Sequence, residues 1–330
     1  MLILAKAAMA MMLGFILTLI CGIIILPILR KKNIGQYVSD MIHERHQKKN
    51  GTPTMGGIIF MIPIFISIGL LLYQGSIELS HNLIILLFTF LAYGLLGFTD
   101  DYLKVHKKNN YGLSMATKFL LQMVIALIFF YMYLKGGGDP TITISFINLS
   151  IPLNWTFGLF ILIVLLGTTN AVNITDGLDG LAGGLSSIAF LAFGIIAWNC
   201  GWLVGYEEIA IFCFVLVGSL LGFLVFNAHP AKVFMGDLGS LALGGALATI
   251  AILTKHEFSL ILIGGVFVLE TLSSLLQIIS IRKFKKKLFK KAPLHHHFEE
   301  LGWCESDIIK LFYVVGFLLA MAAITYGVWL

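Results

Sequence analysis

Cysteine and charged residues are both scarce in this sequence of 330 residues. Its few cysteines are scattered and include no CxxC pair (Cys21, Cys200, Cys213 and Cys304), which argues against a disulfide framework, a thiolate metal site and redox chemistry. Charged residues make up only 12% of the chain, compared with about 25% in an average soluble domain. Because hydrophobic residues reach 58% and the mean hydropathy is +0.95, the composition indicates a membrane protein.

Apolar runs long enough to cross a bilayer, about 20 residues at a helical rise of 1.5 Å, recur along the whole chain. They predict ten transmembrane helices, over residues 4–29, 54–73, 82–99, 118–134, 156–174, 182–200, 208–226, 239–254, 259–281 and 307–329. The first run ends at Pro27 without a small-residue cleavage site, so we expect a retained span rather than a signal peptide. No composition shift marks a soluble domain. Residues 1–330 are therefore expected to form one all-α, multi-pass membrane domain.

Basic residues lie almost entirely on one side of this predicted topology. Of the 22 lysines and arginines, all but Lys6, Lys135 and Lys255 fall in or beside alternate loops that share a side. By the positive-inside rule that side is cytoplasmic, and both termini face outward. The alternating residues within 136–154 predict a small β-hairpin on the outer, periplasmic side. Topology and anionic headgroups account for the net charge of +5, so no nucleic-acid partner is expected.

Aspartates gather at the predicted cytoplasmic ends of the helices. They are Asp100 and Asp101 in GFTDDYLK, Asp176 and Asp179 in NAVNITDGLDGLAGG, and Asp237 in FMGDLGS. Carboxylates at one membrane depth repel each other unless a cation or lysine side chains neutralise them, and Mg²⁺ prefers carboxylates together with substrate phosphates. Helix capping remains an open alternative for Asp237, because a span begins directly after it. Capping does not explain the whole set.

Polar residues recur every three positions before a glycine-rich segment: Asn170, Asn173, Asp176 and Asp179. In a helix this spacing keeps side chains on one face. Gly177 and Gly180 allow backbone N–H groups to approach a ligand, and a helix beginning near Leu181 would favour an anion. The segment therefore indicates a phosphate or nucleotide site, although a glycine-rich turn between two spans is the simpler alternative.

Several other polar residues are weaker candidates. Consecutive imidazoles in PLHHHFE (residues 293–299) cannot all point the same way, which argues against a three-histidine metal site and favours hydrogen bonds to an anionic or sugar ligand. Lys49, before GTPTMGG, could reach a phosphate. In VFNAHPAKVFMGD, Asn227 and Phe234 could bind a nucleotide or simply form a polar turn. Glu270 and Gln277 lie inside the ninth predicted span, where an ionisable group is a functional candidate; with no partner visible, we expect buried structural hydrogen bonds.

Together these motifs resemble the phospho-N-acetylmuramoyl-pentapeptide transferases, a branch of the polyprenyl-phosphate N-acetylhexosamine-1-phosphate transferases. The resemblance covers nearly the whole chain. The DD pair, NxxNxxDGxDG and GDxGS are shared with the wider superfamily, whereas GTPTMGG and PLHHHFE narrow the match to this branch.

The resemblance implies an Mg²⁺-dependent phosphate exchange at the cytoplasmic face of a bacterial inner membrane. Undecaprenyl phosphate attacks UDP-N-acetylmuramoyl-pentapeptide, UMP leaves, and the first lipid-linked intermediate of peptidoglycan synthesis remains. It implies Asp237 as the metal ligand, Asp100 to accept a proton from the lipid phosphate or to position it, Asp101 in support, and His296 among the catalytic residues. It places the donor against Lys49, Asn173, Asp176, Gly177, Leu178, Asp179, Asn227, Phe234, His295 and His297. A homodimer is implied by the resemblance alone.

Two rival functions remain open. A transferase that loads N-acetylglucosamine phosphate on the same lipid would share the aspartate motifs but not the histidine run. A transporter would place ionisable groups near the bilayer midplane, often within inverted repeats, whereas here they gather at one face.

Overall fold

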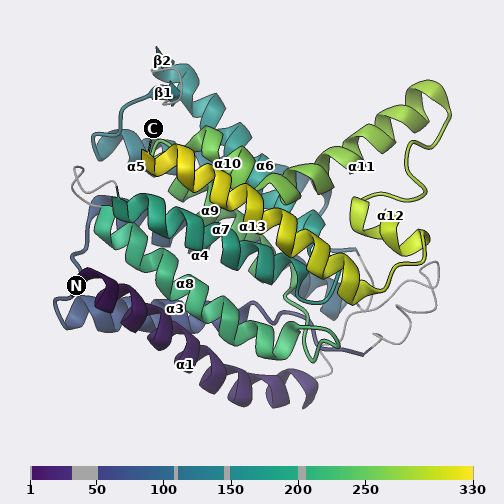
Figure 1. Cartoon of the computed structure of the whole chain (residues 1–330), viewed down its shortest axis with the longest axis horizontal. Helices are drawn as coiled ribbons and strands as arrows, with labels where there is room; N and C mark the ends of the chain where they lie inside the picture. The colour runs from purple at the N-terminus through teal and green to yellow at the C-terminus, as the bar shows by residue number, and fades with distance from the viewer. Residues whose placement is uncertain (1, 32–50, 108–110, 145–148, 200–205, 330) are drawn as a thin grey trace.

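The computed structural model describes residues 2–31, 51–107, 111–144, 149–199 and 206–329, and shows a bundle of long helices (Figure 1). In chain order the α-helices are α1 (Leu2–Lys31), α3 (Ile58–Tyr73), α4 (His81–His106), α5 (Met115–Lys135), α6 (Phe157–Thr175), α7 (Leu181–Asn199), α8 (Tyr206–Asn227), α9 (Gly236–Leu253), α10 (Glu257–Ile263), α11 (Gly265–Phe284), α12 (Leu294–Glu300) and α13 (Glu305–Trp329). A short 3-10 helix, η2 (Asn154–Thr156), precedes α6.

Within the described residues, nine helices are long and apolar enough to cross a membrane. The prediction of an all-α, multi-pass membrane protein is thereby confirmed. The predicted span 54–73 forms the shorter helix α3, of 16 residues, because residues 54–57 pair with the loop before α9 instead: the Gly56 and Gly57 N–H groups donate to the carbonyls of Phe234 and Met235.

Two helices differ from their predicted extents. The ninth predicted span is broken at Gly264 into α10 and α11, at a Gly-Gly pair of the kind that kinks helices. Figure 1 shows α11 leaving the bundle; beyond its far end the chain turns back, and α12 lies beside α11 toward α13. Helix α4 continues to His106, past the predicted end at residue 99, because Asp100 and Lys104 form an ion pair one turn apart that supports the extra turns. The DD pair therefore lies inside the helix.

Helices α7, α8 and α9 form the interior of the bundle. In α9, 89% of the most apolar stretch is buried, compared with 22% in α5 at the periphery. Close approach depends on small residues: a Cβ on Gly218 of α8 would lie 1.9 Å from the Met11 carbonyl of α1. The outer helices expose apolar side chains, as a lipid-facing surface requires.

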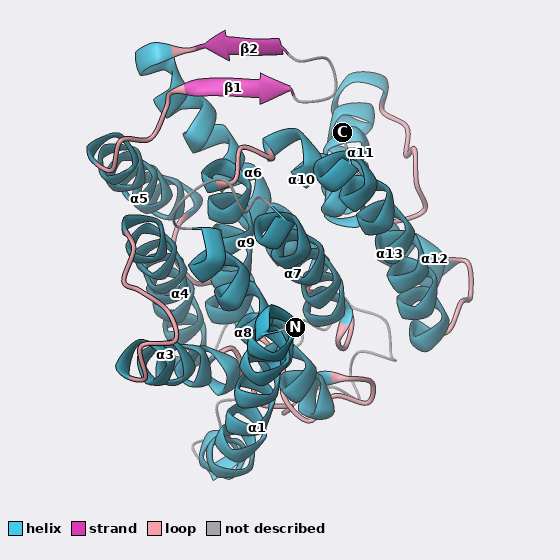
Figure 2. Cartoon of the chain, turned by 60° about the vertical axis from the view of Figure 1, so that its left-hand side comes forward, coloured by secondary structure: helices cyan, strands magenta, loops and turns pink. Residues whose placement is uncertain are grey.

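The predicted β-hairpin is present as β1 (Thr141–Ile144) paired antiparallel with β2 (Leu149–Pro152), with Thr141 opposite Pro152. It lies at one end of the bundle (Figure 2). Helix α6 begins beside the hairpin and crosses the bundle, so its last residue, Thr175, and the turn to α7 lie at the opposite end. The candidate functional residues collect at that end.

Candidate active site

Three of the predicted aspartates meet where α4 packs against α9. Asp100 and Asp101 lie near the end of α4, Asp237 lies in the first turn of α9, and one oxygen from each lies within 4.8 Å of the others. Gly97 permits this approach, since a Cβ there would lie 2.1 Å from the Asp237 carbonyl. Asp100 and Asp101 are almost completely buried, with 3% and 4% exposure, so their charges require partners close by.

Two lysines that the sequence did not single out supply that charge. The Lys104 ammonium lies 2.6 Å from Asp100 Oδ2 and 3.1 Å from Asp237 Oδ2. The Lys118 ammonium, from α5, lies 2.8 Å from the same Asp237 oxygen. The spacing of Lys104 one helical turn after Asp100 was a usable signal. No sequence signal connected Lys118 to Asp237.

Neutral donors hold the carboxylates in place. The N–H groups of Leu113 and Leu238 donate to Asp100 Oδ1 at 2.8 Å and to Asp101 Oδ2 at 3.0 Å. Asn173 Nδ2 donates to Asp237 Oδ1 at 2.8 Å. Asp237 does not cap α9: the N-cap residue is Met235, without a side-chain cap bond. The capping alternative is therefore wrong for Asp237, whose carboxylate faces the lysines and Asn173.

Asp176 adds a fourth carboxylate beside this cluster. Burial raises the pKa of its half-buried carboxyl, as do the nearby charges of Asp237 and Asp101, while a hydrogen bond from the Gly236 backbone opposes the shift. If all four carboxyls are ionised, the two lysines leave a net charge of about −2, which one divalent cation balances. A set of oxygen donors with no sulfur or imidazole among them suits a hard ion such as Mg²⁺.

The polar residues of the turn between α6 and α7, residues 176–180, contact different parts of the protein. Asp176 is the C-cap residue of α6, Gly180 has a φ of +81°, and α7 begins at Leu181 as predicted. Over the helical part, Asn170 and Asn173 keep neighbouring positions on α6, as the spacing predicts, whereas Asp179 lies beyond the end of the helix. Asn170 Nδ2 donates to the Leu166 carbonyl of its own helix. Leu178 lies buried inside the turn.

Asp179 joins the turn to two other segments. Its Oδ2 accepts a hydrogen bond from the Ala231 N–H at 3.0 Å and contacts His229 Nδ1 at 3.1 Å. Its own N–H donates to Glu305 Oε1 of α13 at 2.7 Å. Neither His229 nor Glu305 was predicted from the sequence: His229 lies between Asn227 and Phe234 in the quoted segment VFNAHPAKVFMGD, and Glu305 lies outside the quoted motifs. Among the described residues this trio forms the second cluster of metal-ligand type.

The loop between α8 and α9 brings the last two candidates to the same end. Asn227 is buried, its Nδ2 donates to the Val233 carbonyl at 3.0 Å, and its Oδ1 has no partner within the described part of the chain. Phe234 is half-buried, and its N–H donates to the Pro53 carbonyl. The GTPTMGG segment thus lies beside this loop. Lys49 lies outside the described residues.

The three histidines of α12 point to different partners, as predicted for consecutive imidazoles. His295 is buried and its Nδ1 lies 2.7 Å from Glu270 Oε2. His296 Nδ1 lies 2.6 Å from Glu299 Oε2; burial lowers the pKa of His296, although this hydrogen bond opposes the shift. His297 Nδ1 accepts the Lys290 N–H at 3.1 Å. Of the three, His295 reaches the α6–α7 turn, where Gly177 lies against its ring.

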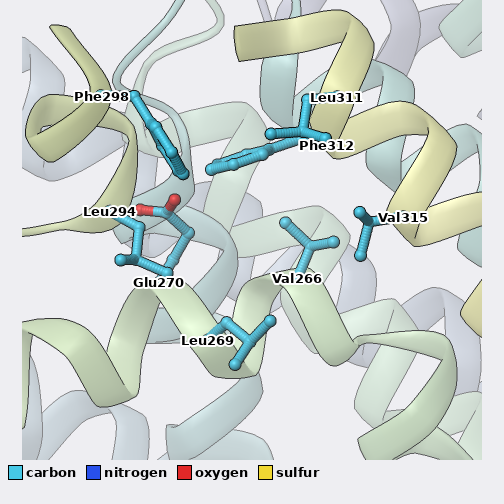
Figure 3. Close-up of a pocket in the computed structure, with 8 residues that line it drawn as sticks. All are labelled: Val266, Leu269, Glu270, Leu294, Phe298, Leu311, Phe312 and Val315. Carbon is cyan, nitrogen blue, oxygen red and sulfur yellow. The ribbon is translucent and has the colours of Figure 1, made fainter. Parts of the chain in front are cut away.

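An apolar cavity of about 170 Å³ lies between α11, α12 and α13 (Figure 3). Seven apolar side chains and one acidic side chain line it: Val266, Leu269, Glu270, Leu294, Phe298, Leu311, Phe312 and Val315. Glu270 thus lines the cavity and contacts His295, whose ring lies beside Gly177 of the α6–α7 turn.

Comparison with known proteins gives matches over nearly the whole chain. Residues 83–255 match the family model described as glycosyl transferase family 4, and residues 49–61 match the first phospho-N-acetylmuramoyl-pentapeptide-transferase signature. Proteins named phospho-N-acetylmuramoyl-pentapeptide-transferase are similar to it along nearly their full length. That from Geobacillus sp. (strain WCH70) is 48% identical over 322 residues, covering 98% of each chain. That from Bacillus subtilis (strain 168) is 48% identical over 319 residues, covering 97% of each.

Proposed function

Because the chain belongs to the phospho-N-acetylmuramoyl-pentapeptide transferase family, we propose that it transfers phospho-N-acetylmuramoyl-pentapeptide from its UDP carrier to undecaprenyl phosphate, releasing UMP. The observation that carries the proposal beyond the family name is the meeting of Asp100, Asp101 and Asp237 with Lys104 and Lys118 at one end of the bundle. This arrangement suits a reaction between two phosphates, because acidic groups can hold a divalent cation and ammonium groups can bind phosphate oxygens.

Asp237 is the proposed principal Mg²⁺ ligand, with Asp100 or Asp101 beside it. When bound, Mg²⁺ would neutralise negative charge on the diphosphate and on the departing UMP. Lys118 and Lys104 lie on the same Asp237 oxygen, and their flexible ammonium groups can turn from that carboxylate to a phosphate. Asn173 holds the other Asp237 oxygen and so fixes the direction in which the carboxylate faces.

Asp100 is proposed to position the lipid phosphate rather than to act as a strong base. Both of its oxygens accept a contact, one from the Leu113 N–H and the other from Lys104, and these two contacts fix the direction in which the carboxylate faces. The acceptor phosphate is already largely ionised at neutral pH, since its second pKa is about 6. Orientation of the two phosphates is therefore the larger contribution expected from this residue.

The nucleotide and sugar parts of the donor are proposed to bind around the α6–α7 turn, which adjoins the aspartate cluster. The α8–α9 loop presents Asn227 and Phe234 at the same end. His295 approaches the turn from α12, with His296 and His297 on the same short helix. Asn227 Oδ1 is buried without a partner among the described residues, which supports a ligand or water in contact with it.

We place this end of the bundle at the cytoplasmic face of a bacterial inner membrane. The support is the asymmetry of basic residues and the position of the hairpin at the other end. The transferase that loads N-acetylglucosamine phosphate remains the second candidate, and the printed names of the relatives favour the muramoyl-pentapeptide substrate. The proposed homodimer is tested by chemical cross-linking in detergent and in nanodiscs.

Release of UMP by the purified protein tests the function. The assay supplies UDP-N-acetylmuramoyl-pentapeptide with and without undecaprenyl phosphate and Mg²⁺, and a parallel reaction supplies UDP-N-acetylglucosamine. We expect UMP and a lipid diphosphate only when all three components of the first reaction are present. Transfer from UDP-N-acetylglucosamine alone would contradict the proposed substrate, and uptake of substrate into vesicles without lipid product would contradict a transferase.

A further inference from the structure

Glu270 is a completely buried carboxylate in the second turn of the apolar helix α11. Its exposure is 0%, and α11 is one of the helices long and apolar enough to span the membrane. An ionised group in such a position is costly unless it is paired and hydrogen-bonded. The sequence offered no partner for Glu270, whereas the structure supplies one from the α12 helix.

Both oxygens of Glu270 are used by the same residue. The His295 backbone N–H donates to Oε1 at 3.1 Å, and His295 Nδ1 lies 2.7 Å from Oε2. Two bonds from one residue to one carboxylate fix the position of the backbone and the rotation of the ring together. Because Nδ1 donates its hydrogen to the carboxylate, the tautomer is fixed as well, and the second ring nitrogen, Nε2, is left for another contact.

That second nitrogen has no partner among the residues that the structure describes, although it is buried. His295 as a whole is 1% exposed. Its Nε2 faces the α6–α7 turn, where a Cβ on Gly177 would lie only 2.3 Å away. A buried nitrogen without a hydrogen bond destabilises the protein relative to one that is satisfied, so this atom indicates a ligand contact.

We propose that Glu270 is a positioning residue of the transferase site, which acts by holding His295 Nε2 toward an oxygen of the UDP-linked substrate bound over Gly177. This inference rests on the proposed function and assigns the role of a residue that the motifs leave out. Glu270 also lines the apolar cavity between α11, α12 and α13. A direct role in that cavity is the competing explanation, and the experiment must separate the two.

The experiment measures kcat and KM for each substrate in turn with Glu270→Gln, Glu270→Asp and His295→Asn. We expect Glu270→Gln to lower kcat/KM for the UDP-linked substrate by about 10- to 100-fold, as carboxylates that orient metal-bound histidines do. The KM for undecaprenyl phosphate should stay within about twofold, because the lipid does not meet Nε2. Glu270→Asp, which keeps the charge, should restore part of the activity.

His295→Asn makes the test specific. The asparagine amide can replace the Nδ1 donor and keep Glu270 hydrogen-bonded, but it has no counterpart of Nε2. If Glu270 acts only through His295, then adding Glu270→Gln to His295→Asn lowers kcat/KM no further, since coupled residues are non-additive in a double-mutant cycle. Glu257→Gln is the matched control: it removes a buried carboxylate from the neighbouring α10 and should leave kcat/KM within about twofold.

Three outcomes would overturn the proposal. They are full activity of Glu270→Gln, an equal fall of kcat/KM in the wild-type and His295→Asn backgrounds, and a change confined to the KM for undecaprenyl phosphate. Thermal unfolding of each purified variant identifies loss of fold, and Glu270→Asp then carries the comparison. Failure of the proposed function itself is recognised separately, because the wild-type protein would then release no UMP in the same assay.

Discussion

Substitution of Gly177 by alanine should disturb the site by displacing the imidazole of His295. The new Cβ would lie 2.3 Å from His295 Nε2, whereas ordinary contact begins at 3.4 Å, so the imidazole has to retreat by about 1 Å. Glu270 lies behind the ring, with Nδ1 and Oε2 already 2.7 Å apart. The ring therefore cannot move straight back and must break this hydrogen bond or rotate. A misplacement of about 1 Å in an active site can cost about 100-fold in rate.

The assay is UMP release at saturating undecaprenyl phosphate, with Gly167→Ala as the control. Gly167 lies in α6, ten residues before Gly177, and a methyl group added there would meet no atom within 4 Å, so this substitution should leave kcat/KM unchanged. Adding Gly177→Ala to His295→Asn should have no further effect, because the shorter asparagine relieves the clash. Normal kcat/KM for Gly177→Ala in the wild-type background would refute the reasoning, as would a second loss in the His295→Asn background.

Three further predictions concern charged groups. Asp237→Asn should lower turnover at least about 100-fold by removing the proposed metal ligand; unchanged turnover in a titration with Mg²⁺ would contradict that role. Lys118→Met should shift half-maximal activation to about tenfold lower Mg²⁺, because the ammonium 2.8 Å from Asp237 opposes a cation; a shift to higher Mg²⁺ would show that it does not compete. Burial raises the pKa of Glu257 from 4.5 to about 7, so the folded protein keeps a proton that the unfolded chain releases, and stability falls as the pH rises through this range. Glu257→Gln should therefore raise the free energy of unfolding by up to about 3 kcal/mol at pH 8 and by little at pH 5. Thermal unfolding of both proteins at the two pH values measures the difference. An equal stabilisation at pH 5 and pH 8 would contradict the raised pKa.

Most of the fold could be predicted because a spanning helix is a local property. An apolar run of about 20 residues is visible in the sequence wherever it occurs, and the hairpin followed from alternation within 136–154. The break at Gly264 was missed because the apolar run continues across it. The position of the DD pair inside α4 was missed for the converse reason: the apolar run ends before the helix does, and an ion pair between Asp100 and Lys104 continues it.

The partners of the site residues were harder to predict, because they depend on helix packing. Lys118 lies 119 residues from Asp237 in the sequence, and before the packing was known it contributed only to the charge asymmetry between the two sides. Glu270 was recognised as buried, but its partner His295 lies 25 residues away beyond the end of α11. Motifs identified the acidic residues, whereas the cations and positioning groups around them required the structure.

The α6–α7 turn shows why the spacing of Asp176 and Asp179 does not give them one role. Because α6 ends at Thr175, the two side chains leave the turn toward different neighbours. Asp176 joins the charges of Asp237 and Asp101, whereas Asp179 holds the α8–α9 loop through Ala231 and the start of α13 through its own N–H. Gly177, between them, lies against His295. Asp176 thus adds negative charge next to the proposed metal, Asp179 holds the loop that carries Asn227, and Gly177 leaves space for the His295 ring. For this reason the glycine-rich turn is also part of the proposed binding site.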